Sequence, residues 1–449
     1  MRHESPRSSR SSVGATIGSG VVKRTPPEDI AAFLSFSGTS CDHLDAMKRL
    51  DARQWQAVMQ WLDDAGLALY FLQKLKDLNA TDSVPPFVVS GLEIDLASNR
   101  LRAEEMSRRF GVLNKAFDDA GVRYAVVKGF SLIPEFCPDA TLRHQSDFDY
   151  LIELDALAVA SQIVVQAGYT PKQSRSSKES IFVLPGGEPS RGAAKYLPLA
   201  PHAVELHTDM WDSALHGVPP IPSLFSTERA IPKCWSGLTF PALADEDAFL
   251  LQVIHACHHL FTLWIRMSNL FEIAYFLNRR AFDEDLWSRI EQRVGDSVIL
   301  QEFVVIVTEL AARLFAAPVP PPVQVWGASL RPAARVWIEH YARRWAFCEL
   351  PVYQFSLFPR SKLALFLRQE YEKSAASQES EQNPARSVSR VGRMSTSIRN
   401  DPSLALNIAW WKRQLLIRRS IFHALSGARY AYELPRWWWL TRTRARSVS

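Results

Sequence analysis

The stretch RHQSDFDYLIEL, residues 143–154, constrains the fold more than any other part of this chain, because it places two acids in an apolar, strand-like run. Side chains alternate between the two faces of a β-strand, so Asp147 and Asp149 share one face while Phe148 and Tyr150 share the other. Two neighbouring carboxylates repel each other unless positive charge lies between them. The stretch therefore predicts a buried strand with positive charge beside one face, and the rest of the chain must indicate whether a metal ion supplies it.

Further strand patterns surround this one. The segments VRYAVVKG, ESIFVLPG and PHAVELHTDMW are rich in β-branched and aromatic residues, and the first two end in turn-forming glycine or proline. A helical pattern, DALAVASQIVVQAG, lies among them and ends at Gly168. Strands that alternate with short helices predict a small mixed sheet, in an α+β or α/β fold, over roughly residues 119–215.

Apolar residues recur with helical spacing on both sides of this segment, whereas the N-terminus is polar and a later stretch is rich in Ser and charge. The expected organisation is a disordered leader at 1–27, a helical region at 28–118, an α/β core at 119–243, a second helical region at 244–373, a flexible linker at 374–402 and a basic, Trp-rich helical tail at 403–449.

Composition excludes several classes of protein. Five scattered cysteines without a Cys-x-x-Cys spacing argue against a disulfide framework or a zinc ribbon, and they suit a reducing, cytoplasmic setting. No apolar run reaches the ~18–20 residues of a transmembrane span, and the N-terminus lacks the apolar core of a signal peptide. A net charge of +5 does not by itself indicate a nucleic-acid or membrane partner.

Three features of the core point to phosphate chemistry. A strand ends at Lys128 and Gly129, the Asp147/Asp149 pair follows, and Glu205 lies between apolar neighbours on a later strand. Three carboxylates on adjacent strands form a cage of oxygen ligands that suits Mg²⁺, and two such ions assist displacement of a pyrophosphate. Lys128 and Arg143 would add positive charge against the phosphates, and a glycine turn lets them approach the backbone.

These residues carry a resemblance to a known family. The stretch VRYAVVKGFSLIPEFCPDATLRHQSDFDYLIEL resembles the core of the uncharacterised nucleotidyltransferase family, within the polymerase-beta-like nucleotidyltransferase superfamily. That family has Lys-Gly after a strand, Arg before Asp-x-Asp, and then Glu-x-His, and this chain has the same motifs in the same order. The helical segments FGVLNKAFDDAGVRY and LLQVIHACHHLFTLWIRMSNLFEIAYFL are also similar, so the resemblance spans roughly residues 30–345.

The resemblance implies a nucleotidyltransferase sheet and a Mg²⁺-dependent transferase that moves a nucleoside monophosphate from an NTP such as ATP to an acceptor hydroxyl, releasing pyrophosphate. Asp147 and Asp149 would be metal ligands, and Glu205 would complete the cage or deprotonate the acceptor. The candidates for nucleotide binding are Lys128, Gly129, Ser131, Arg143 and His207. A small molecule, a sugar, a protein or an RNA end all remain open as the acceptor.

Other interpretations stand beside this one. Phe130 follows Gly129 where the superfamily usually has a small residue, which favours a catalytically degenerate module that senses nucleotides or binds a partner. Arg143 could instead pair with the aspartates, and His207 and Asp209 could be ordinary strand and solvated residues. A polymerase acting on nucleic acid is disfavoured by the modest charge and by the absence of a basic segment near the motif.

Two further motifs are ambiguous. His255, His258 and His259 lie near one helix face, but the sequence lacks the His-Glu-x-x-His pattern of a zinc site, so packing or contact with a nucleotide is expected. The tail mixes Trp with Arg, and its helix either packs on the main body through Trp, lies on an anionic membrane surface, or stacks on nucleic acid.

Overall fold

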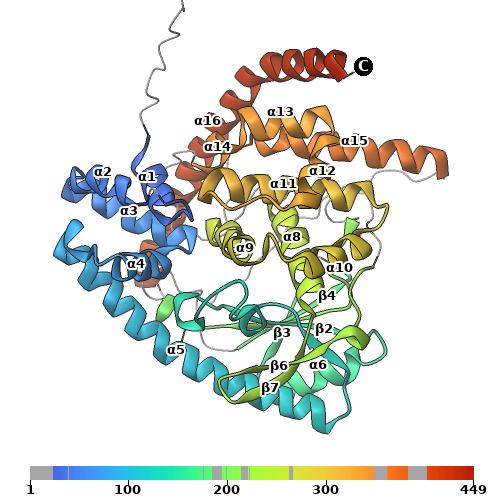
Figure 1. The fold of residues 1–449 in the computed structure, drawn as a ribbon. Coiled ribbons are helices and arrows are strands. Elements are labelled where there is room, and N and C mark those ends of the chain that lie inside the picture. Colours follow the sequence, from blue (N-terminus) through green and yellow to red (C-terminus); the bar gives the residue numbers. More distant parts are fainter. Residues whose placement is uncertain are drawn as a thin grey trace, which may run out of the picture.

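A computed structural model describes residues 24–38, 40–174, 176–184, 195–198, 200–213, 221, 223–261, 266–347, 362–382 and 402–448. The described chain places one mixed sheet between two groups of helices (Figure 1). The N-terminal helices are α1 Pro26–Leu34, α2 Leu44–Lys48, α3 Ala52–Ala65, α4 Ala68–Asp77 and α5 Pro86–Asp119. This arrangement confirms the predicted α+β fold with a mixed sheet flanked by helices.

The sheet contains seven strands in the order β3-β4-β5-β2-β1-β7-β6. Their bounds are β1 Tyr124–Val126, β2 Asp147–Ile152, β3 Thr170–Lys172, β4 Glu179–Val183, β5 Ala203–His207, β6 Ile231–Trp235 and β7 Leu238–Ala242. The pairs β2–β5 and β1–β7 are parallel, and the other neighbours are antiparallel. The two acid-bearing strands, β2 and β5, are therefore direct neighbours near the middle of the sheet.

Helix α5 covers the apolar side of strand β2. The ring of Phe110 lies 5.6 Å from that of Phe148 and 6.2 Å from that of Tyr150, and the Tyr150 hydroxyl donates a 2.9 Å hydrogen bond to Asn114 Oδ1. Because strand residues alternate, this packing directs Asp147 and Asp149 to the other side of the sheet. Helix α6 Leu157–Gln166 lies with α5 below the sheet in Figure 1. Helices α8 Asp245–Phe261, α9 Met267–Arg280 and α10 Glu284–Val294 lie above it.

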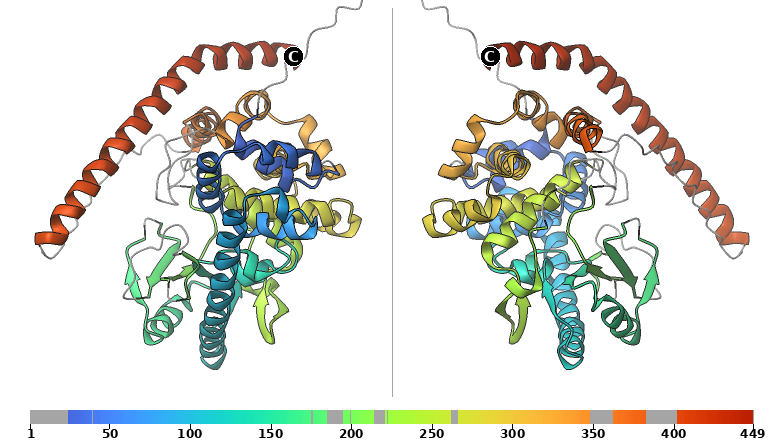
Figure 2. Two further views of the ribbon diagram at one scale, coloured as in Figure 1. Left: turned by 90° about the vertical axis from the view of Figure 1, so that its left-hand side faces the viewer. Right: turned by 90° about the vertical axis from the view of Figure 1, so that its right-hand side faces the viewer.

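After strand β7, the regular secondary structure of the described residues is helical. Besides α8, α9 and α10, the helices are α11 Val298–Phe315, α12 Pro321–Ala328, α13 Pro332–His340, α14 Ala342–Ala346, α15 Ala364–Gln382 and α16 Pro402–Val448. The last of these is a long helix that runs along one flank of the molecule (Figure 2). Within the described residues, no helix has the length and apolar character needed to span a membrane.

The helices depart from the expected boundaries at two places. Helix α1 begins at Pro26, inside the expected leader, and residues 1–23 lie outside the described part. Helix α15 continues to Gln382, so the expected linker 374–402 is helical over its first nine positions and its last, Pro402, begins α16. The physical reason is composition, since the run SAASQESEQ contains Ala, Gln and Glu, which favour helix without an apolar period. The rest of that segment lies outside the described residues.

Candidate active site

Strands β2 and β5 bring two of the predicted acids together. The parallel register pairs Asp147 with Ala203, Asp149 with Glu205, and Leu151 with His207. Paired residues on neighbouring strands point to the same side of a sheet, so the carboxylates of Asp149 and Glu205 lie side by side. This register agrees with the sequence prediction that Glu205 lies on a strand adjacent to the strand of the two aspartates.

Asp149 is almost completely buried and is held by two basic side chains. Lys128 Nζ donates a 2.7 Å hydrogen bond to Asp149 Oδ1, and His207 Nε2 lies 3.2 Å from the same oxygen. The side chain of Asp149 is 1% exposed, that of His207 is 8% and that of Lys128 is 12%. Positive charge from the chain itself therefore lies between the acids, which the sequence argument assigned to metal ions alone.

The pKa values of this group follow from these contacts. Burial opposes ionisation of Asp149, but the Lys128 charge and the hydrogen bond from His207 outweigh it and hold the pKa of Asp149 below its usual value. Burial also opposes protonation of His207, yet contacts with the Asp149 and Glu205 carboxylates raise its pKa to about 9. These contacts favour a protonated His207 ring whose Nε2–H donates to Asp149, and a metal ion bound through this nitrogen would have to displace that proton.

Glu205 has the opposite electrostatic environment. Burial raises its pKa, contact with His207 lowers it, and the charges of the two aspartates raise it again, so that the pKa of Glu205 is about 7. Its Oε2 lies 3.6 Å from His207 Nε2. A carboxyl that titrates near neutral pH can accept a proton from a substrate hydroxyl and release it again.

Within the described residues, one group can offer three ligand atoms to a metal ion. Asp149, Glu205 and His207 place two carboxylate oxygens and one imidazole nitrogen within 4.8 Å of one another. Asp147 is not part of this group, although it shares the strand face, and its Oδ2 accepts a 3.2 Å hydrogen bond from Ser146 Oγ. Burial and the Asp149 charge raise the pKa of Asp147. The donor set fits a divalent cation that accepts oxygen ligands with one nitrogen.

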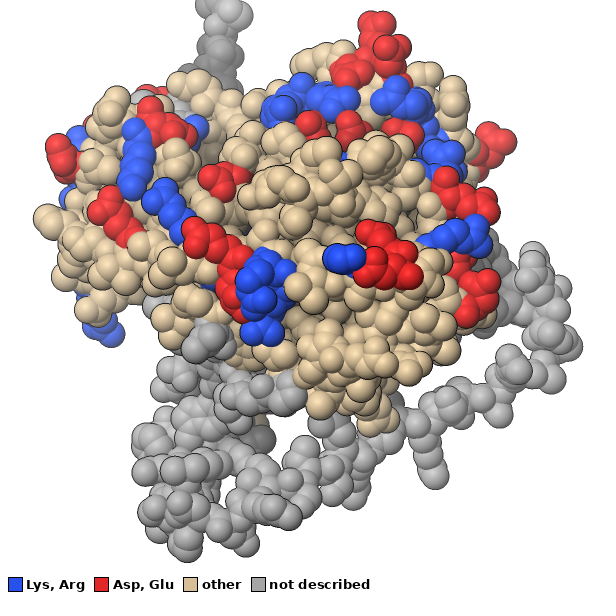
Figure 3. Space-filling view, turned by 90° about the horizontal axis from the view of Figure 1, so that it is seen from below, with Lys and Arg blue, Asp and Glu red and all other residues tan. Residues whose placement is uncertain are grey.

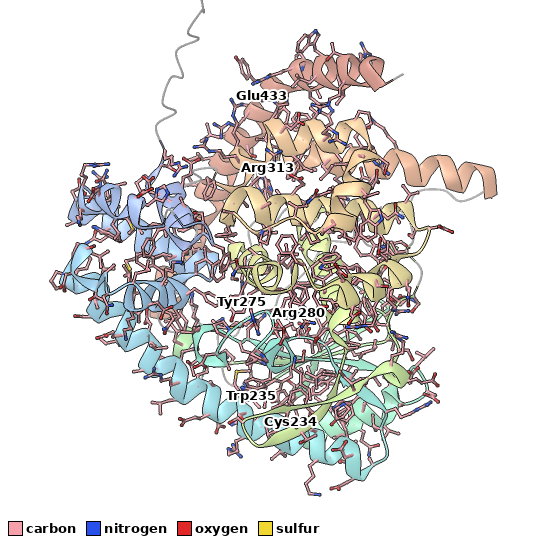
Figure 4. The ribbon with its side chains drawn as sticks, in the orientation of Figure 1. Cys234, Trp235, Tyr275, Arg280, Arg313 and Glu433 are labelled. Carbon is pink, nitrogen blue, oxygen red and sulfur yellow. The ribbon has the colours of Figure 1, made fainter. Side chains whose placement is uncertain are left out.

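The turn after β1 depends on a glycine. Gly129 has φ +63°, and a Cβ atom at this position would lie 2.4 Å from Gln145 Nε2. Ser131, also a candidate for nucleotide binding, donates a 3.1 Å hydrogen bond from Oγ to the Lys128 carbonyl oxygen. The Phe130 ring, which raised the idea of a degenerate site, stacks on Trp235 at 4.1 Å and is 1% exposed. Trp235 lies on β6 (Figure 4), so Phe130 points into the core and away from the opening of the turn.

Arg143 makes an ion pair that the sequence did not indicate. Its Nε donates a 3.0 Å hydrogen bond to Glu272 Oε1 on α9, and Tyr70 OH on α4 donates to the same oxygen at 3.0 Å. The alternative that Arg143 pairs with the aspartates is not what the structure shows. Burial opposes the charge of Arg143, but the Glu272 carboxylate outweighs it and raises the pKa of Arg143. The charge of Arg143 still acts on Asp147, which places the guanidinium near the acids.

The histidines of α8 lie near the same group. His255 Nε2 and His259 Nε2 are 3.0 Å apart. Burial, together with the positive charge of Lys128, holds the pKa of His255 well below its usual value, so the ring is neutral. Asp209, beyond the end of β5, has its Oδ2 3.7 Å from Lys178 Nζ and is half-buried. The effect of the Lys128 charge on His255 indicates that this part of α8 lies near Lys128 and so near Asp149.

Sequence reasoning missed three residues that support this group. Glu179 on β4 has its Oε1 3.8 Å from His207 Nδ1. Gln145 lies against Gly129 and donates from Nε2 to the Asp147 carbonyl oxygen at 3.1 Å. Arg102 on α5 is 1% exposed and donates to the carbonyl oxygens of Gln145 and Ala200 at 3.0 and 2.7 Å. Of the three, only Glu179 lies in a segment that the sequence predicted as a strand, ESIFVLPG. That strand, β4, pairs with β5, which carries the Glu-x-His motif.

The fold and the acid group define a class of protein. A mixed sheet whose central neighbouring strands carry Asp-x-Asp and Glu-x-His, flanked by helices, is consistent with a nucleotidyltransferase. The sequence model of the family described as uncharacterised nucleotidyltransferase matches residues 51–316, which is 266 of the 449 residues. The chain therefore belongs to this family, as its motifs indicated. No curated protein and no solved structure compared with the chain gave a match.

Proposed function

We propose that the protein transfers a nucleoside monophosphate from an NTP to an acceptor hydroxyl and releases pyrophosphate, in a Mg²⁺-dependent reaction. Family membership supports nucleotidyl transfer in general. The observation that carries the proposal is the grouping of Asp149, Glu205 and His207 on two adjacent parallel strands. We propose Asp147, Asp149 and Glu205 as metal-holding residues, with His207 beside them.

The bound cations would polarise the attacking oxygen and neutralise charge on the leaving pyrophosphate. The chain's own residues do the remaining work. Glu205, beside the metal-holding aspartates, accepts the proton of the acceptor hydroxyl as that oxygen attacks the α-phosphorus and pyrophosphate leaves. Lys128 and Arg143 hold the phosphates by charge, and the Gly129 turn with Ser131 brings the backbone close to them. Candidate acceptors are a small molecule, a sugar, a protein or an RNA end.

One observation favours a second candidate function, a nucleotide-binding module without turnover. Lys128 Nζ and His207 Nε2 already contact Asp149 at 2.7 and 3.2 Å, so the chain can neutralise this acid without a metal ion. The buried position of Phe130 removes the sequence argument that led to the same idea. In this alternative the protein binds an NTP and signals through a partner.

Mass spectrometry tests the two functions. The purified full-length chain is incubated with a mixture of NTPs, Mg²⁺ and pools of candidate acceptors. The molecular masses of the protein and of the acceptors are then measured. A mass increase of one nucleoside monophosphate, with pyrophosphate release, identifies the base and the acceptor together. Thermal stabilisation by an NTP, without any mass increase or pyrophosphate, would instead support the binding module.

A further inference from the structure

Helix α16 exposes a continuous apolar stripe along one side. Ile421, Leu425, Tyr432 and Trp439 are respectively 47, 58, 83 and 64% exposed. The stripe recurs every three or four positions and consists of Ile417, Ile421, Leu425, Ala428, Tyr432, Pro435 and Trp439. With 3.6 residues per turn these positions lie on one side of the helix, over about 33 Å of its length at 1.5 Å per residue. The helix contains Pro435 within this stretch and is bent (Figure 2).

The opposite side of α16 attaches the helix to the body. Trp437 is 3% exposed, and its ring stacks on Phe366 with centroids 5.0 Å apart. Glu433 accepts a 2.5 Å hydrogen bond from Arg344, and Ser426 Oγ accepts one of 2.9 Å from the Lys362 backbone N–H. Glu433 lies where α16 meets the helices of the body (Figure 4). Tyr430, whose ring stacks on Phe366 at 4.5 Å, and Leu434 and Leu440 also pack against the core, so the side that attaches α16 to the body is not the apolar stripe.

The charges around the stripe have one sign. Residues 403–449 contain a single acid, Glu433, which is buried in its ion pair, and nine basic residues, Lys412, Arg413, Arg418, Arg419, Arg429, Arg436, Arg442, Arg444 and Arg446. Among the described side chains of α16, the exposed ionic groups Arg429, Arg436 and Arg442 are all positive. At 100° per residue, Arg429 and Arg436 lie along one edge of the stripe and Arg442 lies along the other.

We propose that this surface, the α16 outer face, docks on an anionic lipid membrane. The outer face comprises the apolar stripe together with Arg429, Arg436 and Arg442. The helix would lie in the plane of the interface, with its apolar side chains among the acyl chains and its arginines against lipid phosphates. Trp439 and Tyr432 have the amphipathic rings that favour the headgroup level. The inference is independent of the proposed nucleotidyl transfer.

Charge and position favour a membrane over other occupants. Two copies of the outer face would bring arginines against arginines, with no exposed described carboxylate on α16 to pair with them. A nucleic acid would use the arginines but would leave most of the aliphatic stripe without a partner. In the side views α16 stands at the edge of the molecule, and its C-terminal part lies over the top of the body with no other helix drawn outside it (Figure 2). A flat surface can therefore reach it.

The face of the molecule seen from below lacks this one-sided charge (Figure 3). On the face seen from below, Lys and Arg side chains alternate with Asp and Glu (Figure 3). Helix α5 also exposes apolar residues, Ile94 at 66% and Leu101 at 56%, but charged residues of both signs lie beside them, such as Glu93 and Arg100. Ile94 and Leu101 therefore offer a matched control, because they expose apolar area that is not flanked by arginines alone.

The test is co-flotation of the full-length protein with lipid vesicles. Vesicles of phosphatidylcholine mixed with phosphatidylglycerol should carry the protein, vesicles of phosphatidylcholine alone should not, and added salt should weaken the binding. The triple variant Leu425→Ser/Tyr432→Ser/Trp439→Ser should bind at least about tenfold more weakly, because it removes the buried apolar area. The triple variant Arg429→Ser/Arg436→Ser/Arg442→Ser should lose the preference for the anionic vesicles.

The control variant Ile94→Ser/Leu101→Ser should bind as the natural chain does. Thermal midpoints should stay unchanged in all three variants, since the substituted side chains are exposed. Absence of the natural chain from the floated anionic vesicles would overturn the proposal, as would an equal loss in the α5 control. A dimer that the stripe variant dissociates, without vesicle binding, would assign the outer face to a second copy and would also overturn it.

Discussion

Asp149 and Glu205 lie directly opposite each other on the parallel strands β2 and β5, and Lys128 Nζ contacts the first of these carboxylates at 2.7 Å. One acid is thus held ionised by a buried amine, whereas burial and nearby negative charge raise the pKa of the other to about 7. Two adjacent carboxyls with opposite pKa shifts can have different roles, one as a ligand and one as a base.

The first prediction concerns Asp149. We expect Asp149→Asn to lower kcat for nucleotidyl transfer by at least about a thousandfold, or about 4 kcal/mol, because the amide removes the charge that would hold a cation. Pyrophosphate release with the acceptor identified by mass spectrometry measures the effect. Circular dichroism should show that the fold persists, although loss of the Lys128 partner will lower the thermal midpoint.

Asp209→Asn is the control for this change, because Asp209 lies beyond the same sheet's strand β5 and pairs only loosely with Lys178, at 3.7 Å. It should leave kcat within about twofold, as expected for a weak ion pair outside the acid group. Full turnover in Asp149→Asn would overturn the proposed role of Asp149 in catalysis, and it would also exclude the module without turnover.

The second prediction compares two glycines with nearly the same backbone conformation. Gly121 and Gly129 have φ values of +66° and +63°, but a Cβ atom would meet no atom within 4 Å at Gly121 and would lie 2.4 Å from Gln145 at Gly129. Gly121→Ala should lower the free energy of unfolding by about 1–2 kcal/mol, the ordinary cost of a left-handed conformation. Gly129→Ala should cost distinctly more.

Differential scanning fluorimetry of the two alanine variants measures this difference. The Gly129 variant should also lose NTP-induced thermal stabilisation, because the turn that brings the backbone to the phosphates has to move. Equal shifts in the two variants would mean that Gln145 gives way easily, and the tight approach at Gly129 would then have no role.

The sequence predicted the local parts of this fold well. Alternation of apolar and acidic residues predicted β2 and β5, and turn residues predicted the ends of β1 and α6. The hairpin of β6 and β7 was not singled out, although Ser236 and Gly237 form its tight turn with positive φ. Local patterns suggested that β2 and β5 are neighbours but could not set their pairing, because register between strands more than 50 residues apart depends on packing of the whole sheet.

The contacts around the site were the least predictable part. Glu272 reaches Arg143 from 129 positions along the chain, and Arg102 reaches Ala200 from 98 positions. No local pattern encodes such pairs, since they depend on how helices pack over the sheet. The same limit explains Phe130, which looked like an obstruction in the sequence and is a core residue against Trp235 in the structure.

The third prediction concerns Arg102, which ties the two acid-bearing strands together. Its guanidinium donates to the carbonyl oxygens of Gln145, just before β2, and of Leu197 and Ala200, ahead of β5. We expect Arg102→Met to destabilise the protein by about 2–4 kcal/mol, because several buried carbonyls lose their donors. Arg102→Lys should recover only part of this, since an ammonium lacks the planar fork.

Thermal denaturation of these variants, with Arg100→Met as the control, checks the prediction. Arg100 lies two positions away on α5 and is exposed, so its replacement should change stability by less than about 0.5 kcal/mol. If Arg102→Met were as stable as the control, the guanidinium would not be holding the strands, and water would have to satisfy the carbonyls.

The fourth prediction is a pH dependence of stability caused by Asp95 on α5. Asp95 is 7% exposed; burial and the Asp63 carboxylate raise its pKa to about 6, with Lys195 opposing, against an ordinary value of 3.8. A group whose pKa is higher in the folded state stabilises the protein fully below its unfolded pKa. That stabilisation is lost as the pH rises through the folded pKa.

Asp95→Asn should therefore stabilise the protein at about pH 8, by up to about 3 kcal/mol, and should have little effect at about pH 4, where the carboxyl is protonated in the folded state. Thermal midpoints of the variant and the natural chain across this range measure the difference. Asp82→Asn serves as the control for the same substitution at an exposed position. If the difference in thermal midpoint between Asp95→Asn and the natural chain stayed constant from acid to alkaline pH, the amide would be acting through packing or hydrogen bonding. The surroundings of Asp95 would then not oppose its ionisation.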